Sequence, residues 1–132
     1  MNYTLQVEGQ DLIISPSKEE VVSSIESLTP NGGPGFLILE SSNGDYVQSA
    51  GGNGRYLVEF RKYSEGGFTH CCAGNLPEKT KIVEIPTNGF CVQLQENEVL
   101  VQEEVKTIFI EFLLSGHALN DFSWRDKTKD FV

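Results

Sequence analysis

Hydrophobic and polar residues alternate along several short stretches of this chain, a pattern typical of β-strands that bury one face. The first stretch places Tyr3, Leu5 and Val7 on one side, with polar residues between them. A turn at Gly9 then leads to the apolar residues 12–14. The chain is therefore predicted to open with a β-hairpin.

The middle of the chain is predicted to form a run of short strands, because each apolar stretch is followed by a turn sequence. Asn43-Gly44 is a hairpin signal, and a glycine-rich turn follows at residues 51–54. Residues 36–39 are apolar throughout, which is typical of a strand buried on both faces. Connections this short join neighbouring antiparallel strands into a meander. The predicted strands are residues 36–39, 46–50, 56–60, 68–72, 81–85 and 90–94.

Two stretches have the period of a helix with one apolar face. The first begins either at Ser15, with Pro16 in the first turn, or at Ser17, with Glu20 completing a capping box. It ends in the loop at residues 30–35. Its apolar face consists of Val21, Val22, Ile25 and Leu28.

The second helix is predicted over residues 101–114, with Gly116 as its C-terminal stop. Residues 118–124 are expected to cover the core, whereas residues 127–132 are expected to fray. The apolar stripe of this helix consists of Val101, Val105, Ile108, Phe109, Phe112 and Leu113, and Leu119, Phe122 and Trp124 are the covering residues that follow it.

These elements predict the fold class. A chain of 132 residues suits one domain with one core, so we predict a single domain over residues 1–132. Each element must bury its apolar side, and strands outnumber helices. The prediction is an α+β fold, with a twisted, mainly antiparallel sheet of about six strands and two helices packed on one face.

The charge balance restricts the partners. Nineteen acidic residues against ten basic ones give a net charge of −9, which repels nucleic acid and anionic membranes and favours a basic protein partner. Solubility alone is the alternative explanation for this charge. No apolar run approaches the ~20 residues of a membrane span, and the first residues lack the pattern of a signal peptide, so a cytoplasmic location is expected.

Few residues offer catalytic or metal chemistry, so we predict no enzyme activity, no catalytic residues and no cofactor. The three cysteines are expected to be free, and a thiol-imidazole pair could only join Cys71 or Cys72 with His117 and Asp121. A zinc site that used His70 and Cys91 would also need Cys71 and Cys72, which point to opposite faces of a strand. The glycine-rich residues 32–35 and 51–54 lack the lysine of a phosphate loop and are predicted to be turns.

Two groups of polar residues are candidates for partner binding. Glu59 and Arg61 lie on the strand face opposite the core, where Gln48 and Tyr46 can join them. A face that is simply solvated explains the same pattern. The second group surrounds the start of the last helix, where helix capping and solubility are the alternative to partner binding. It consists of Glu96, Glu98, Glu103 and Glu104.

Taken in order, these residues resemble the immunity proteins of bacterial polymorphic toxin systems, the group commonly encoded beside deaminase-type toxins. The matching segments are FLIL at 36–39, YVQSA at 46–50, YLVEF at 56–60, GFTH at 67–70 and EVKTIFIEFL at 104–113, followed by Gly116 and Trp124. They cover most of residues 36–124.

The resemblance implies a small cytoplasmic protein that binds a cognate protein toxin and covers its active site. Gln48, Glu59 and Trp124 are the positions most typical of the family. The toxin could be a deaminase or a nuclease that acts on nucleic acid, whereas the chain itself is expected to bind neither nucleic acid nor membrane. Two alternatives stay open: a small cytosolic enzyme that uses Cys71 or Cys72 with a histidine, and a small-molecule binding domain.

Overall fold

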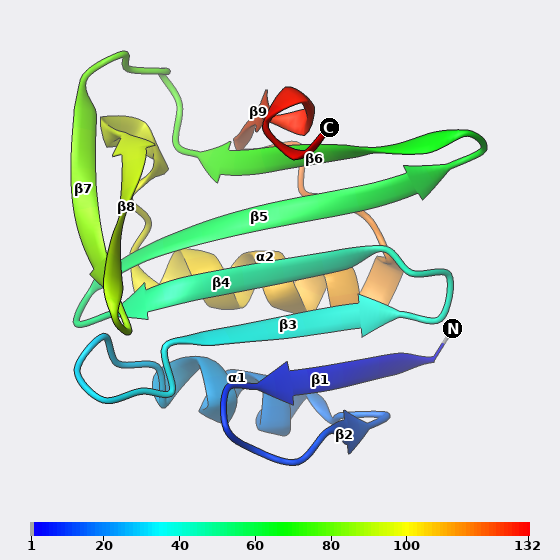
Figure 1. The fold of residues 1–132 in the computed structure, drawn as a ribbon. Helices are drawn as coiled ribbons and strands as arrows, with labels where there is room; N and C mark the ends of the chain where they lie inside the picture. Colours follow the sequence, from blue (N-terminus) through cyan, green and yellow to red (C-terminus); the bar gives the residue numbers. More distant parts are fainter. Residues whose placement is uncertain (1) are drawn as a thin grey trace.

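The structure is a computed structural model that describes residues 2–132. It contains a seven-stranded sheet, a separate two-stranded sheet and two α-helices, which confirms the predicted α+β class (Figure 1). All neighbouring strands of the large sheet are antiparallel. In spatial order they are β2 (Ile13–Ile14), β1 (Tyr3–Val7), β3 (Phe36–Ser41), β4 (Tyr46–Gly52), β5 (Arg55–Ser64), β6 (Gly67–Gly74) and β9 (Ser123–Asp126).

Both helices pack on one face of the large sheet, as predicted (Figure 1). Helix α1 (Lys18–Glu26) begins at Ser17, whose Oγ accepts a hydrogen bond of 3.1 Å from the backbone N–H of Glu20. The Glu20 carboxylate accepts one of 2.9 Å from the backbone N–H of Ser17, so the second of the two predicted starts is the one formed. Helix α2 (Gln102–Ser115) ends at Gly116, which adopts the left-handed conformation at φ 75°.

The main core lies between these helices and the sheet. Val105, Ile108, Phe109 and Phe112 of α2 are buried, as the apolar stripe predicts. The prediction is wrong for Val101, which is 52% exposed because it lies at the N-cap, before the first turn of the helix. The segment after α2 also covers the core as expected. Trp124 stacks edge-on against Phe60 with ring centroids 6.0 Å apart, and its Nε1 donates a hydrogen bond of 2.7 Å to the Leu119 carbonyl.

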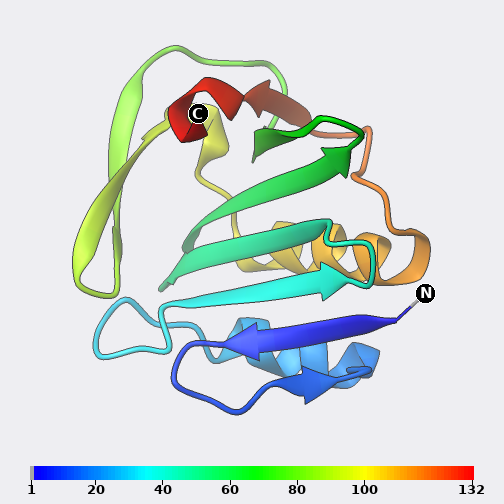
Figure 2. The same ribbon diagram turned by 45° about the vertical axis from the view of Figure 1, so that its right-hand side comes forward.

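The last two predicted strands do not extend the large sheet. Strands β7 (Ile82–Thr87) and β8 (Phe90–Gln95) pair only with each other and fold across the face that the helices leave open (Figure 2). Ile85 and Leu94 of this hairpin pack on Leu57 and Cys72 of the large sheet. The predicted continuous meander is wrong here, because a second small core holds the hairpin against the sheet.

The C-terminal segment is ordered rather than frayed. The short 3₁₀ helix η2 (Thr128–Phe131) lies beside β6. The backbone N–H of Lys127 donates to the His70 carbonyl at 2.7 Å, and the backbone N–H of His70 donates to Thr128 Oγ1 at 3.0 Å. Phe131 packs on the His70 ring with centroids 4.2 Å apart. The expectation of fraying over 127–132 is therefore wrong.

Candidate functional site

The face of the large sheet opposite the helices, between the β7–β8 hairpin and residues 127–131, is called here the open face. Strand register determines its central residues. Gln48 of β4 lies opposite Glu59 of β5, and Tyr46 lies opposite Arg61. The four predicted binding residues of β4 and β5 therefore share the open face.

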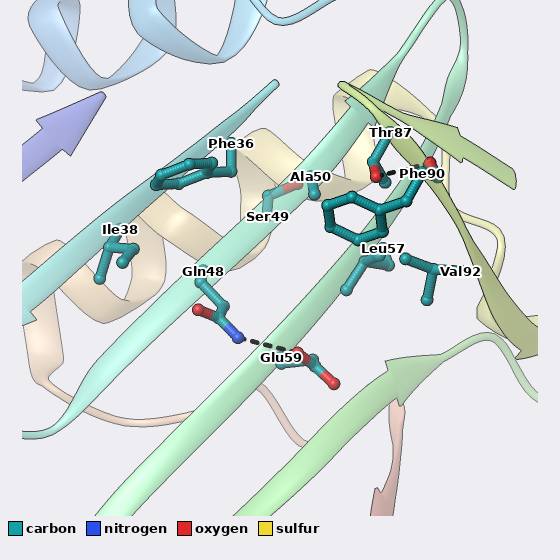
Figure 3. Close-up of a pocket in the computed structure, with 10 residues that line it drawn as sticks. All are labelled: Phe36, Ile38, Gln48, Ser49, Ala50, Leu57, Glu59, Thr87, Phe90 and Val92. Carbon is teal, nitrogen blue, oxygen red and sulfur yellow. Dashed lines mark hydrogen bonds between the residues drawn. The ribbon is translucent and has the colours of Figure 1, made fainter. Parts of the chain in front are cut away.

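A pocket of about 250 Å³ lies where the hairpin meets the open face (Figure 3). Phe90 at the start of β8 and Phe36 at the start of β3 lie in its wall, and they are 67% and 39% exposed. The partial exposure of Phe36 also corrects the prediction that residues 36–39 are buried on both faces. The pocket is lined by Phe36, Ile38, Gln48, Ser49, Ala50, Leu57, Glu59, Thr87, Phe90 and Val92.

Glu59 is the central charged group of the open face, and it is only 7% exposed. Its carboxylate accepts a hydrogen bond of 2.8 Å from Gln48 Nε2 and forms an ion pair of 2.9 Å with Lys127 Nζ. Burial raises the pKa of Glu59, but the contacts with His70 and Lys127 outweigh burial and bring the pKa down to about 2. Glu59 is thus a compensated buried carboxylate, and a simply solvated face does not describe it.

His70 extends this network and is fully buried. Arg61 Nε donates a hydrogen bond of 3.0 Å to His70 Nδ1, so the proton of a neutral imidazole lies on Nε2. Nε2 faces Glu59 Oε1 at 3.4 Å, too long for a full hydrogen bond. Arg61 also stacks over Phe68, with its guanidinium carbon 4.0 Å from the ring centroid. Both His70 and Arg61 are held by structural contacts.

Polar contacts fix the hairpin over the pocket. Glu8 Oε1 accepts hydrogen bonds from the backbone N–H of Gly35 at 2.7 Å and from Asn88 Nδ2 at 3.1 Å. Arg55 donates a hydrogen bond of 3.0 Å to the Glu84 carbonyl of β7. The absence of a side chain at Gly35 lets Asn88 pack directly on the loop. The pocket is therefore formed before any partner arrives.

The four glutamates near α2 do not form one surface patch. Glu98 is buried, and its carboxylate accepts hydrogen bonds of 2.7 and 2.9 Å from Arg125. Glu96 lies 3.6 Å from the Lys79 ammonium group. Of the remaining pair, Glu104 accepts from the Val101 backbone N–H at 2.9 Å, and Glu103 lies 3.3 Å from Lys106 Nζ. Each of the four has a structural partner, as the capping alternative proposes for the helix start.

Trp124 lies away from the other predicted binding residues. It packs against Phe60 and the helix-side core, so the sheet separates its ring from Gln48 and Glu59. Four further residues of the open face were not predicted as binding residues: Phe36, Phe90, Lys127 and Phe131. The position of Phe90 directly after a turn at Gly89 was the one local indication of an exposed aromatic residue.

Cys71 and Cys72 lack the environment of an activated nucleophile. Burial and the nearby Glu98 and Glu59 carboxylates strongly raise the pKa of Cys72, while burial and Asp126 raise that of Cys71. The two side chains lie on opposite faces of β6, since Cys72 packs under the hairpin with Leu57. His117 is exposed beyond the end of α2. Within residues 2–132, no cluster of three His, Cys, Asp or Glu side chains could hold a metal ion.

Comparisons with known proteins add no relative. No protein-family model, curated protein or solved structure matches this chain. In the part of the chain that the structure describes, each helix is too short or too polar to cross a bilayer.

Proposed function

We propose that this chain is an immunity protein, which binds a cognate bacterial toxin and covers the toxin's active site with its open face. The observation that carries the proposal is the preformed pocket between the hairpin and the sheet, with the partly exposed Phe36 and Phe90 in its wall. Aromatic residues are enriched at protein interfaces, and the strongest contacts fill well-packed pockets. Two more aromatic residues of this face, Tyr63 and Phe131, are each 44% exposed.

The pKa values of the titratable groups at this site favour a binding role over a catalytic one. A general base works best with a pKa near the working pH, whereas the pKa of Glu59 is about 2. The raised pKa values of Cys71 and Cys72 keep these thiols protonated. The groups on which a thiol enzyme would depend are therefore poorly suited to acid-base or nucleophilic steps.

The proposed mechanism is stoichiometric inhibition. The net charge of −9 would speed the encounter with a toxin whose nucleic-acid cleft is basic. The aromatic residues of the open face would then slow release by filling the interface. The charge acts over the whole molecule, because Glu59 and the four glutamates near α2 already have local partners.

The test is to co-express the chain with the product of the neighbouring gene. The proposal predicts that the chain restores growth to cells that express the toxin, and that the two purified proteins elute as one complex in size-exclusion chromatography. Phe90→Ala should weaken the complex, whereas Leu114→Ala is the matched control, because Leu114 is 74% exposed at the end of α2, the helix behind the sheet. Failure to rescue growth, with no complex at micromolar concentrations, contradicts the proposal.

A further inference from the structure

The pocket on the open face has two chemically different parts. Its walls are apolar and come from both sheets, with Phe36 and Leu57 on the large sheet and Phe90 on the hairpin. Gln48 and Glu59 lie together in its lining and are joined by a hydrogen bond of 2.8 Å (Figure 3). An occupant must therefore combine an apolar body with one polar group.

The polar part of the pocket offers hydrogen-bond acceptors. An ionised carboxylate only accepts, so the Gln48 amide directs its NH₂ group toward Glu59 and its carbonyl oxygen away. Figure 3 shows this oxygen on the side of Gln48 that faces Ile38. Among residues 2–132, no hydrogen bond reaches Gln48 Oε1. This oxygen is not among the buried polar atoms that lack a partner, so solvent reaches it in the free protein, and an occupant that displaces this solvent is expected to bring a donor in its place.

The charges around Glu59 favour a neutral donor over a cation. Lys127 Nζ already neutralises the carboxylate at 2.9 Å. A second ammonium or guanidinium group would lose its hydration in the apolar pocket and would be repelled by Lys127. A neutral N–H or O–H group avoids both costs and still satisfies Gln48.

The size of the pocket favours a single side chain. Small-molecule sites in proteins usually measure about 300–1,000 Å³. This pocket, at about 250 Å³, lies below that range. Tryptophan and tyrosine combine an apolar ring with one donor, and both are enriched among the residues that dominate protein interfaces.

We propose that the pocket receives one neutral aromatic side chain of the partner protein, a tryptophan or a tyrosine. The ring packs between Phe36 and Phe90, and its N–H or O–H group donates to Gln48 Oε1. This inference rests on the proposed function for the identity of the partner. The chemical preference of the pocket can be tested without it.

The first experiment uses small probes and the isolated chain. Indole and p-cresol reproduce the two side chains, and indene and toluene have nearly the same shapes without the donor. The titrations are followed by two-dimensional amide NMR, and at least one of the two donor probes should bind with a millimolar dissociation constant. Its binding should be about five to ten times tighter than that of the hydrocarbon of the same shape. The amide signals that shift should belong to β4, β5 and β8. Equal or tighter binding of the hydrocarbons, or no binding of either donor probe, overturns the proposal.

Two variants localise the binding. Ala50→Leu fills the pocket from β4 and should abolish the probe shifts, while Ala118→Leu places the same change outside the pocket as a control. Phe90→Ala removes an exposed wall and should weaken probe binding about tenfold, which keeps the test decisive if Ala50→Leu does not fold. Unchanged probe binding in folded Ala50→Leu or in Phe90→Ala overturns the assignment of the pocket.

The second experiment measures how tightly this chain binds the purified product of the neighbouring gene. Ala50→Leu should reduce it at least 30-fold, since about 2 kcal/mol is the threshold for an interface hot spot. A folded Ala50→Leu variant that binds as tightly as the wild type overturns the pocket proposal and leaves the proposed function standing. A wild-type chain that binds the probes but not this protein contradicts the proposed function instead.

Discussion

The ion pair between Glu59 and Lys127 gives the sharpest quantitative prediction for the open face. A fall of the Glu59 pKa from 4.5 to about 2 corresponds to about 3 kcal/mol of stability at neutral pH, at about 1.4 kcal/mol for each pKa unit. Glu59→Gln keeps the shape of the side chain but removes its charge, and it leaves Lys127, whose side chain is 15% exposed, without a counter-ion. We expect this variant to lose about 2–3 kcal/mol of unfolding free energy at pH 7.

The pH dependence follows from the direction of the pKa change. A carboxylate whose pKa is lowered by folding stabilises the protein above the pKa of the unfolded chain and loses this contribution as the pH falls toward the folded value. The Glu59 contribution is therefore full above about pH 5 and is lost between about pH 4.5 and 2. The difference in stability between wild type and Glu59→Gln should shrink over that interval.

Urea unfolding at a series of pH values measures this difference. Glu84→Gln is the matched control, because the Glu84 side chain is exposed on β7 and only the backbone carbonyl of this residue accepts a hydrogen bond, from Arg55. This variant should change the unfolding free energy by less than about 0.5 kcal/mol. A double-mutant cycle with Lys127→Met should give a coupling of about 1–3 kcal/mol. A loss below 1 kcal/mol for Glu59→Gln at pH 7, or one that does not change down to pH 2, refutes the reasoning.

Three further changes test the packing around this face and the core. Phe109→Ala, which empties a fully buried position of α2, should cost about 3–5 kcal/mol in urea unfolding, and a cost below 1 kcal/mol would contradict its place in the core. Ser49→Ala removes a buried hydroxyl that has no hydrogen-bond partner, so unfolding should show equal or slightly higher stability, and a loss above 1 kcal/mol would reveal a missed contact. Gly35→Ala places a methyl group against Asn88, so it should lower the unfolding free energy by about 1–3 kcal/mol and weaken indole binding in the NMR titration. Wild-type stability and wild-type indole affinity in this variant would show that Gly35 does not fix the hairpin.

Local patterns predict most of the strands and both helices of this chain. The capping box at Ser17 and Glu20, the stripe of α2 and the stop at Gly116 are all determined within a few residues, and the structure forms them as expected. The alternation of β4 and β5 also places Gln48 and Glu59 on one face of the sheet, and the observed register then sets them side by side. Short-range physics is sufficient for these features.

The hairpin and the C-terminal segment depend on distant contacts. The alternation in β7 and β8 is the same whether the hairpin extends a sheet or folds across one. The deciding residues are Leu57 and Cys72, which make part of the opposite sheet face apolar. Similarly, Lys127 is ordered by Glu59, which lies 68 positions away in the sequence. The local pattern of hydrophobic and polar residues does not predict a contact between residues so far apart in the sequence.

The most direct test of the central claim is the hydrogen-exchange footprint of the complex with the product of the neighbouring gene. If the open face is the binding surface, amides in β3, β4, β5 and the β7–β8 hairpin should exchange more slowly in the complex, while those of α1 and α2 should be unchanged. Slower exchange confined to the two helices, with the open face unaffected, would contradict the account.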